Sequence, residues 1–117
     1  MHFAIATTWG PTDTTRASLP FIFASSAISA GDTAMIMLFH DAVFVAIEGT
    51  YETMVPVGLT ERYLEVFSHP NAEVVVCKSC AIARGITGNM LVSNCRLGGM
   101  NDFHAHVALD ECKAICF

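Results

Sequence analysis

The fold is decided by residues 3–39, which read FAIATTWGPTDTTRASLPFIFASSAISAGDTAMIMLF. The two ends of this stretch, residues 3–6 and 34–39, are short apolar runs bounded by turn residues, and such runs are typical of strands buried on both faces. Between them, a helix over residues 14–30 is predicted by apolar residues at helical spacing: Ala17, Phe21, Ala24 and Ile28. A strand, a helix and a second strand in this order form a βαβ unit, so the stretch predicts a parallel sheet with right-handed crossovers.

The rest of the chain continues this alternation. Further strands are expected at residues 73–77, 92–96 and 114–117, and further helices at residues 60–67, 79–84 and 101–109. Residues 48–58 contain Pro56 and Gly58 and are expected to form a loop, and Pro20 is expected to kink the first helix. Because no repeat or linker interrupts the 117 residues, the sequence predicts one layered α/β domain over residues 1–117.

The amino-acid composition indicates which partners and which location to expect. With 53% apolar and 15% charged residues, the chain holds a surplus of hydrophobic side chains that we expect to lie partly in a subunit interface. Polar residues break its most apolar region, residues 19–39, into segments too short to span a bilayer, so no membrane partner is expected. No export signal is visible at the start, so the cytoplasm is the expected location. Six scattered Lys and Arg residues in a chain of net charge −5 offer no basic stripe for nucleic acid.

Candidate site residues follow from where the predicted strands end. In open parallel sheets, ligands bind outside the carboxyl ends of the strands. The first predicted strand leads into the segment WGPTD at residues 9–13, the second into residue 40, and the third into the segment CKSC at residues 77–80. We therefore expect five side chains to converge on this edge: Trp9, Thr12, Asp13, His40 and Cys80.

Cys80 is the residue best suited to chemistry, because it lies at the start of the helix predicted after the third strand. Unpaired backbone N–H groups and the helix dipole favour a thiolate there, and Lys78 and Arg84 are near in sequence. A thiolate attacks sulfane sulfur and then holds it as a persulfide. The alternative is that Cys80 is a buried small hydrophobic residue, as free cysteine often is. Packing is the expected role of the other cysteines outside this segment: Cys95, Cys112 and Cys116.

Cys77 forms a C-x-x-C pair with Cys80, which leaves further interpretations open. A structural zinc site would need a second ligand pair that the sequence does not offer, so no metal is expected. A dithiol redox pair has this spacing, but Cys77 ends an apolar run, so we expect it to be buried, with a resolving role open. His40 is placed to move a proton or to orient a sulfur donor, with a structural role as the alternative. Asp13 has a sufficient role as the cap of the first helix.

Four segments resemble the DsrE/DsrF-like sulfur-relay family, whose members share the YchN-like fold. They are residues 3–31, the run AMIMLF at residues 34–39, the block VVVCKSCAIARGI at residues 74–86 and the ending at residues 97–117. The strand followed by C-x-x-C-A-x-x-R-G-I is the most specific part. The resemblance implies a three-layer α/β domain, with a mostly parallel sheet of about five strands and helices on both faces.

The resemblance also implies a function. The family's sulfur-carrying cysteine, at the start of the helix after the third strand, corresponds to Cys80. The implied role is that of a sulfurtransferase or sulfur carrier that holds persulfide sulfur covalently and needs no cofactor, with supporting residues around Cys80: Cys77, His40, Asp13, Trp9, Thr12 and Lys78. The implied partners are further copies of the chain, as a homotrimer or homohexamer, and donor or acceptor proteins such as a TusA-like carrier. Many relatives keep no functional cysteine, so two alternatives stay open: a non-catalytic binding or assembly module, and a thiol redox protein that uses Cys77 and Cys80.

Overall fold

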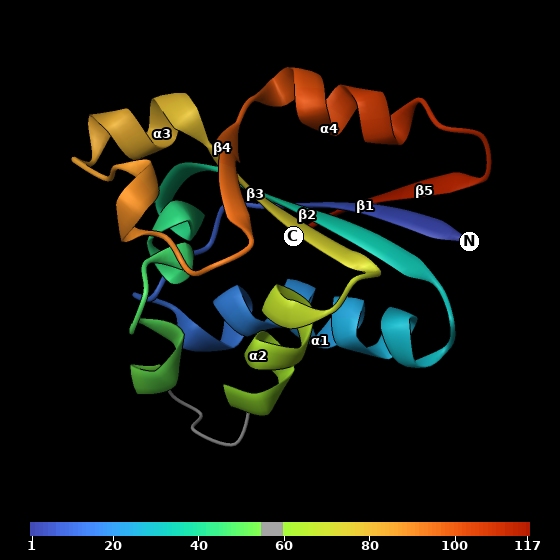
Figure 1. Ribbon diagram of the computed structural model, residues 1–117, viewed down its shortest axis with the longest axis horizontal. Coiled ribbons are helices and arrows are strands. Elements are labelled where there is room, and N and C mark those ends of the chain that lie inside the picture. Colours follow the sequence, from blue (N-terminus) through green and yellow to red (C-terminus); the bar gives the residue numbers. More distant parts are fainter. Residues whose placement is uncertain (55–59) are drawn as a thin grey trace.

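The centre of the fold is a sheet of five parallel strands in the order β4-β3-β2-β1-β5 (Figure 1). The computed structural model describes residues 1–54 and 60–117. The strands are β1 (His2–Thr7), β2 (Thr33–Leu38), β3 (Ala72–Cys77), β4 (Cys95–Gly98) and β5 (Cys112–Cys116). The parallel α/β fold predicted from the sequence is confirmed.

Helices cover both faces of the sheet and make it the middle of three layers (Figure 1). On one face, α1 (Thr14–Ser29) and α2 (Thr60–Ser68) pack against each other and against the central strands. On the other face, α4 (Met100–Val107) lies over β1 and β5. The short α3 (Lys78–Ala83) follows β3 directly and packs against η1, a 3₁₀-helical segment at His40–Ala46. In the described part of the chain, no helix combines the length and apolarity needed to cross a membrane.

The first βαβ unit shows how local sequence builds this frame. Asp13 is the N-cap of α1, and its Oδ1 accepts the backbone N–H of Arg16 at 3.1 Å. After the helix ends, Gly31 takes a φ of 88°, a left-handed conformation that suits glycine. Pro20 lies buried inside the helix, which continues through it from Thr14 to Ser29. The proline therefore does not end α1, although it removes one backbone donor.

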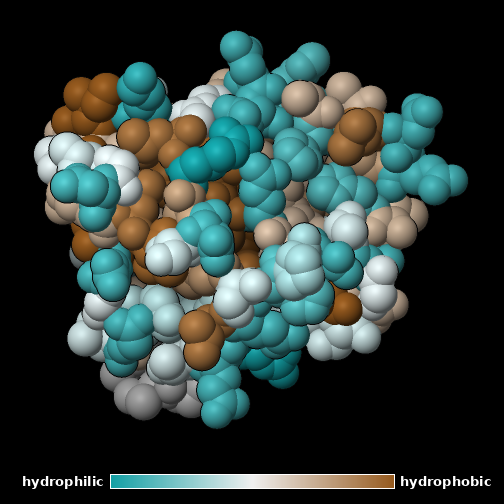
Figure 2. Space-filling model, viewed as in Figure 1, coloured by the Kyte–Doolittle hydropathy of each residue, from teal (hydrophilic) through white to brown (hydrophobic). Residues whose placement is uncertain are grey.

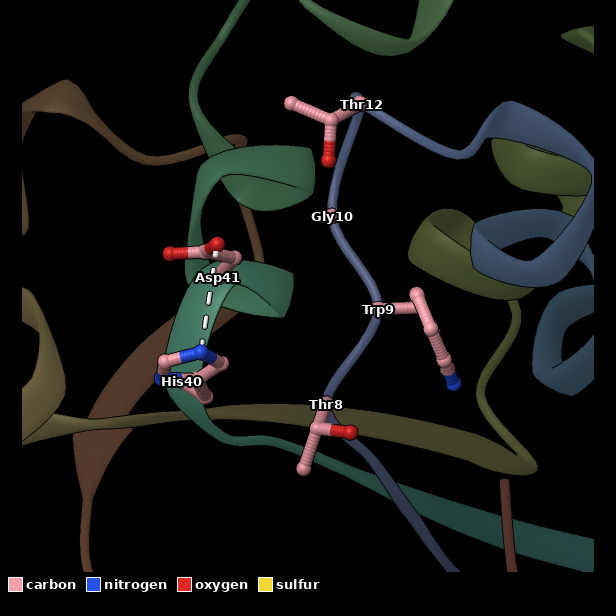
Figure 3. Close-up of a pocket in the computed structure, with 6 residues that line it drawn as sticks. All are labelled: Thr8, Trp9, Gly10, Thr12, His40 and Asp41. Carbon is pink, nitrogen blue, oxygen red and sulfur yellow. Dashed lines mark ion pairs between the residues drawn. The ribbon is translucent and has the colours of Figure 1, made fainter.

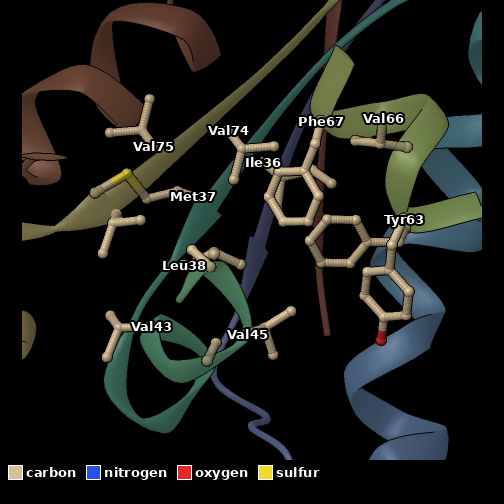
Figure 4. Packing of buried hydrophobic residues seen from close by; sticks show 14 of the residues in the cluster. Ile36, Met37, Leu38, Val43, Val45, Tyr63, Val66, Phe67, Val74 and Val75 are labelled. Carbon is tan, nitrogen blue, oxygen red and sulfur yellow. The ribbon is translucent and has the colours of Figure 1, made fainter. Parts of the chain in front are cut away.

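The hydrophobic core is built around β2, which lies between β1 and β3. Its residues from Met35 to Leu38 are completely buried because helices and loops cover both faces. On the α1 and α2 face, the ring centroid of Phe21 lies 4.5 Å from that of Tyr63 and 5.3 Å from that of Phe67. Figure 4 shows Tyr63 and Phe67 of α2 among the strand residues of this core. This packing holds the carboxyl ends of the central strands in fixed positions.

Some element boundaries differ from the sequence prediction for local reasons. The strand expected at residues 92–96 begins only at Cys95, because the Val92 N–H binds the carbonyl of Ala46 at 2.8 Å and Asn94 turns the chain with a φ of 74°. No helix was expected at His40–Ala46, where η1 forms. The expected loop at residues 48–58 contains a 3₁₀ turn, η2 (Tyr51–Thr53), and its residues 55–58 lie outside the described residues.

Candidate functional site

Cys80 lies where β3 gives way to α3, at the carboxyl edge of the sheet. Cys77 is the last residue of β3 and α3 begins at Lys78, so Cys80 occupies the first helical turn. Its half-buried side chain packs against the core, and its Sγ accepts a hydrogen bond from the backbone N–H of His40 at 3.2 Å. The sulfur is therefore held at the edge of the sheet without being sealed inside the core.

The backbone of His40 takes an uncommon conformation at this contact. Its φ is 53°, in the left-handed region, which costs a residue with a side chain about 1–2 kcal/mol. Histidine is among the residue types that adopt this conformation more often than most. The turn between β2 and η1 thereby aims the His40 N–H at Cys80 Sγ. Strain of this kind is often held at functional sites.

Arg84 joins the two segments that meet at this edge. From the C-cap of α3, its Nε donates to Asp41 Oδ1 at 2.9 Å, its Nη1 donates to the carbonyl of Cys80 at 3.2 Å, and its Nη2 lies 2.8 Å from His40 Nδ1. A guanidinium only donates, so His40 Nδ1 is the acceptor and a neutral His40 ring carries its proton on Nε2. That Nε2 is 3.9 Å from Asp41 Oδ2. Neither role is evident from the sequence, where Asp41 only follows a strand and Arg84 is only a nearby charge.

A pocket of about 190 Å³ opens beside His40 and Asp41 (Figure 3). Its walls come from the loop after β1 and from the start of η1: Thr8, Trp9, Gly10, Thr12, His40 and Asp41. Gly10 lets the two segments touch, because a Cβ there would overlap the backbone carbonyl of Asp41. The shape of the pocket therefore depends on the missing side chain at position 10.

The structure brings three of the predicted site residues together in this pocket. Trp9 and Thr12 line it with His40, and His40 in turn contacts Cys80. The Trp9 side chain points away from His40 in Figure 3, and the Arg16 guanidinium lies 4.4 Å from the centroid of its ring. Trp9 thus shapes the wall of the pocket mainly through its backbone and the base of its side chain.

The other four predicted residues do not line the pocket: Cys77, Cys80, Asp13 and Lys78. Asp13 caps α1, and its second oxygen lies 3.7 Å from the Arg16 guanidinium. Lys78 begins α3 with its side chain exposed to solvent. The described residues also contain no group of three or more His, Cys, Asp or Glu side chains arranged to hold a metal ion.

The two cysteines of the C-x-x-C pair interact with each other. Cys77 is only 6% exposed, and its Sγ lies 3.5 Å from Ser79 Oγ. Burial acts to raise the pKa of Cys77, but the Ser79 hydroxyl and the N–H groups of Cys80 and Ser79 outweigh it and lower that pKa. Burial raises the pKa of Cys80, as does its hydrogen bond with Cys77, against the opposing effects of the His40 N–H and Arg84. Negative charge in the pair is thus favoured on Cys77, whereas the sequence predicts it on Cys80.

Comparisons with known proteins find similar chains in sequence and in fold. The DsrE/DsrF-like family matches residues 1–115. The uncharacterized protein MJ0989 of Methanocaldococcus jannaschii is 31% identical over 110 residues, which cover 92% of each chain. Among solved structures, the ychN protein of E. coli has a TM-score of 0.83 at 18% identity and covers 100% of this chain and 99% of its own. MTH1491 of Methanobacterium thermoautotrophicum, a protein of unknown function, has a TM-score of 0.77 at 11% identity, with 99% and 98% covered.

Proposed function

Because this chain belongs to the DsrE/DsrF-like family, we propose that it is a sulfur-relay protein that accepts sulfane sulfur as a persulfide on Cys80 and passes it to an acceptor. The contact between Cys80 and His40 carries the proposal. The sulfur is half-buried at the carboxyl edge of the sheet, and a backbone N–H points at it from 3.2 Å. A fixed donor at this position stabilises negative charge on the sulfur, both as a thiolate and as a persulfide.

Cys77 and Cys80 have different roles when the sulfur is loaded. When Cys77 is ionised, a form that its lowered pKa favours, it accepts the proton that Cys80 loses as its Sγ attacks the sulfane sulfur of a donor. A bond forms between Sγ and that sulfur, and the bond between the sulfur and the rest of the donor breaks. The rest of the donor leaves with the electron pair. Cys77 needs no access to solvent for this role, because it moves only a proton.

The pocket beside His40 supports the approach of a sulfur donor or partner protein from the side of the loop after β1. Its polar groups are the Thr8 and Thr12 hydroxyls, the His40 ring and the Asp41 carboxylate. A neutral His40 carries its proton on Nε2, 3.9 Å from Asp41 Oδ2, because Arg84 occupies Nδ1. We propose that this pocket receives the small sulfur donor or the tip of a donor or acceptor protein, such as a TusA-like carrier. The protein then acts as a carrier or a sulfurtransferase according to the partner.

We propose that the protein works as a homo-oligomer, a trimer or hexamer, with the site close to a subunit boundary. Ile82, two residues after Cys80 on α3, is 65% exposed. Figure 2 shows hydrophobic side chains gathered on the left of this view, over α3 and the segments next to it. An exposed apolar side chain so close to the sulfur favours a second subunit packing there. Native mass spectrometry measures the oligomeric state, and a stable monomer would contradict this expectation.

Mass spectrometry after incubation with polysulfide tests the function. The wild-type chain should gain sulfur on Cys80, the Cys80→Ser variant should gain none at that position, and Cys95→Ser should load like the wild type. A loaded chain mixed with a TusA-like carrier should lose its sulfur to the carrier's cysteine. Absence of any adduct on Cys80 of the wild-type chain would leave a binding or assembly module of the same fold.

A further inference from the structure

We propose a second activity, which rests on the proposed function: Cys77 attacks the persulfide on Cys80, releases the outer sulfur as hydrosulfide and closes a Cys77–Cys80 disulfide. The protein can thereby lose its persulfide sulfur in two ways. It transfers the sulfur to a docked acceptor, or it releases the sulfur as sulfide while Cys77 and Cys80 are oxidised to a disulfide.

The two sulfur atoms are already neighbours. Cys77 is the N-cap of α3 and Cys80 lies three positions further, a spacing that places side chains on one face of a helix about 5–6 Å apart at their Cβ atoms. The two thiols also influence each other's pKa, each lying close enough to the other to shift it. Disulfides form between cysteines whose Cα atoms are within about 7 Å, so closure of this bond requires little movement of the backbone.

The exposure of the two residues sets the order of events. Cys77 is 6% exposed and belongs to the core cluster, so a donor molecule or a carrier protein does not reach it. Cys80 is half-buried and contacts the backbone N–H of His40, a residue that lines the pocket, so it is the cysteine that is loaded. Once Cys80 carries sulfur, its Sγ is the electrophile next to Cys77. Cys77 therefore attacks Cys80 Sγ, the inner sulfur of the persulfide, because it lies beside that atom.

The surroundings of Cys77 favour its thiolate, which is the form that attacks the persulfide. The Ser79 hydroxyl lies 3.5 Å from its sulfur and, with the N–H groups at the start of α3, lowers the pKa of Cys77 despite burial. A thiolate is the nucleophile in thiol–disulfide and persulfide exchange. Burial of its side chain also keeps competing thiols away from it.

The step is balanced without any further oxidant. A bond forms between Cys77 Sγ and Cys80 Sγ, and the bond between Cys80 Sγ and the outer sulfur breaks. Cys77 first returns the proton that it took up during loading to the outer sulfur, and the outer sulfur then leaves as HS⁻ with this proton and the bonding electron pair. The sulfane sulfur is reduced to sulfide, and the two cysteines are oxidised to a disulfide. An external dithiol reductant restores both thiols by exchange and becomes a disulfide itself.

The test begins with a chain loaded to completion with polysulfide, freed of excess reagent and incubated without reductant. Released sulfide is measured over time, and the cysteine peptides are mapped by mass spectrometry under non-reducing conditions. The wild-type chain should release one sulfide for each persulfide lost and should show the Cys77–Cys80 disulfide. The Cys77→Ser variant should keep its persulfide, with sulfide release at least about tenfold slower, which corresponds to about 1.4 kcal/mol in the barrier. Cys112→Ser, which removes a thiol on β5, should behave like the wild type.

The two proposals fail in different ways. If neither the wild type nor Cys77→Ser takes up sulfur on Cys80, the sulfur-relay function and the second activity are both contradicted. If both load and hold the persulfide equally long, and no Cys77–Cys80 disulfide forms, only the second activity is contradicted. Should Cys77→Ser not fold or not load, the disulfide map and the sulfide count of the wild-type chain decide the question alone.

Discussion

The guanidinium of Arg84 lies 2.9 Å from the carboxylate of Asp41 and ties the end of α3 to the segment that follows β2. The same guanidinium contacts the ring of His40 and the carbonyl of Cys80. These contacts hold His40 where its backbone N–H meets Cys80 Sγ. Arg84 is therefore a positioning residue: it influences the sulfur through groups that it holds in place.

Replacing Arg84 by alanine should raise the pH at which Cys80 becomes reactive. The charge of Arg84 and the His40 N–H that it positions both act to lower the pKa of Cys80, so the loss of both raises that pKa. We expect an upward shift of about 0.5–1 pH unit in the profile of Cys80 alkylation, or about three- to tenfold slower alkylation below the midpoint. Peptide mass spectrometry after timed exposure to iodoacetamide measures the rate at this cysteine.

Arg96 provides a matched control for this experiment. It lies 2.9 Å from both Glu73 and Asp102, so Arg96→Ala removes one ion-paired guanidinium, as Arg84→Ala does. These partly exposed ion pairs contribute little to stability, and Arg96→Ala should leave the alkylation profile of Cys80 unchanged. An equal shift in both variants would show that a general loss of charge or stability, and not positioning, is responsible.

Gly10→Ala should destabilise the protein by about 1–3 kcal/mol, because its Cβ overlaps the backbone carbonyl of Asp41 and forces the two segments apart. Gly88→Ala is the matched control, because a Cβ at Gly88 meets the Leu97 side chain only at an ordinary contact distance of 3.6 Å. That variant should stay within about 0.5 kcal/mol of the wild type. Urea unfolding measures both free energies, and equal values would contradict the close approach at Gly10.

Tyr63→Phe should raise the free energy of unfolding by about 1 kcal/mol. The Tyr63 hydroxyl is buried and has no hydrogen-bond partner among the described residues, so its removal relieves a desolvation penalty and keeps the ring against Phe21. Tyr51→Phe is the comparison, because the hydroxyl of Tyr51 interacts with Glu52 and its loss brings no such gain. A clear loss of stability in Tyr63→Phe, measured by urea unfolding, would mean that the hydroxyl is satisfied.

Cys95 should make stability fall with rising pH in the alkaline range. Burial raises the pKa of this thiol from its ordinary value of 9.0 to about 12. Below pH 9.0 the folded and unfolded states both keep the proton, so the contribution is fully present; at higher pH the unfolded chain loses its proton first, and the contribution is lost as the pH rises toward 12.

Urea unfolding of the wild type and of Cys95→Val over this pH range isolates the effect. The difference between their free energies of unfolding should change with a slope that approaches about 1.4 kcal/mol per pH unit. Cys116→Val, at an exposed thiol on β5, controls for the loss of a thiol as such. A constant difference between the wild type and Cys95→Val would contradict the raised pKa.

The sheet could be predicted from sequence because its central strands carry a strong local signal. Strands buried on both faces are nearly continuous in apolar residues, and β2 and β3 show this clearly. The signal of β4 is weak because the strand has four residues and none of them is fully buried, so its expected bounds were wrong. Likewise η1 was missed, because a short 3₁₀ segment has no helical period to detect.

The order of the central elements and the place of Cys80 after β3 followed from sequence alone, because each depends on neighbouring residues and their period. Tertiary structure alone decided that Gly10 touches Asp41, that Arg84 holds His40, and that the hydrogen bonds around Cys77 lower its pKa. Arg84 and His40 are 44 residues apart in the chain, and no local pattern encodes their distance. The charge on a thiol depends on burial and on the hydrogen bonds around it, which exist only after the strands have packed.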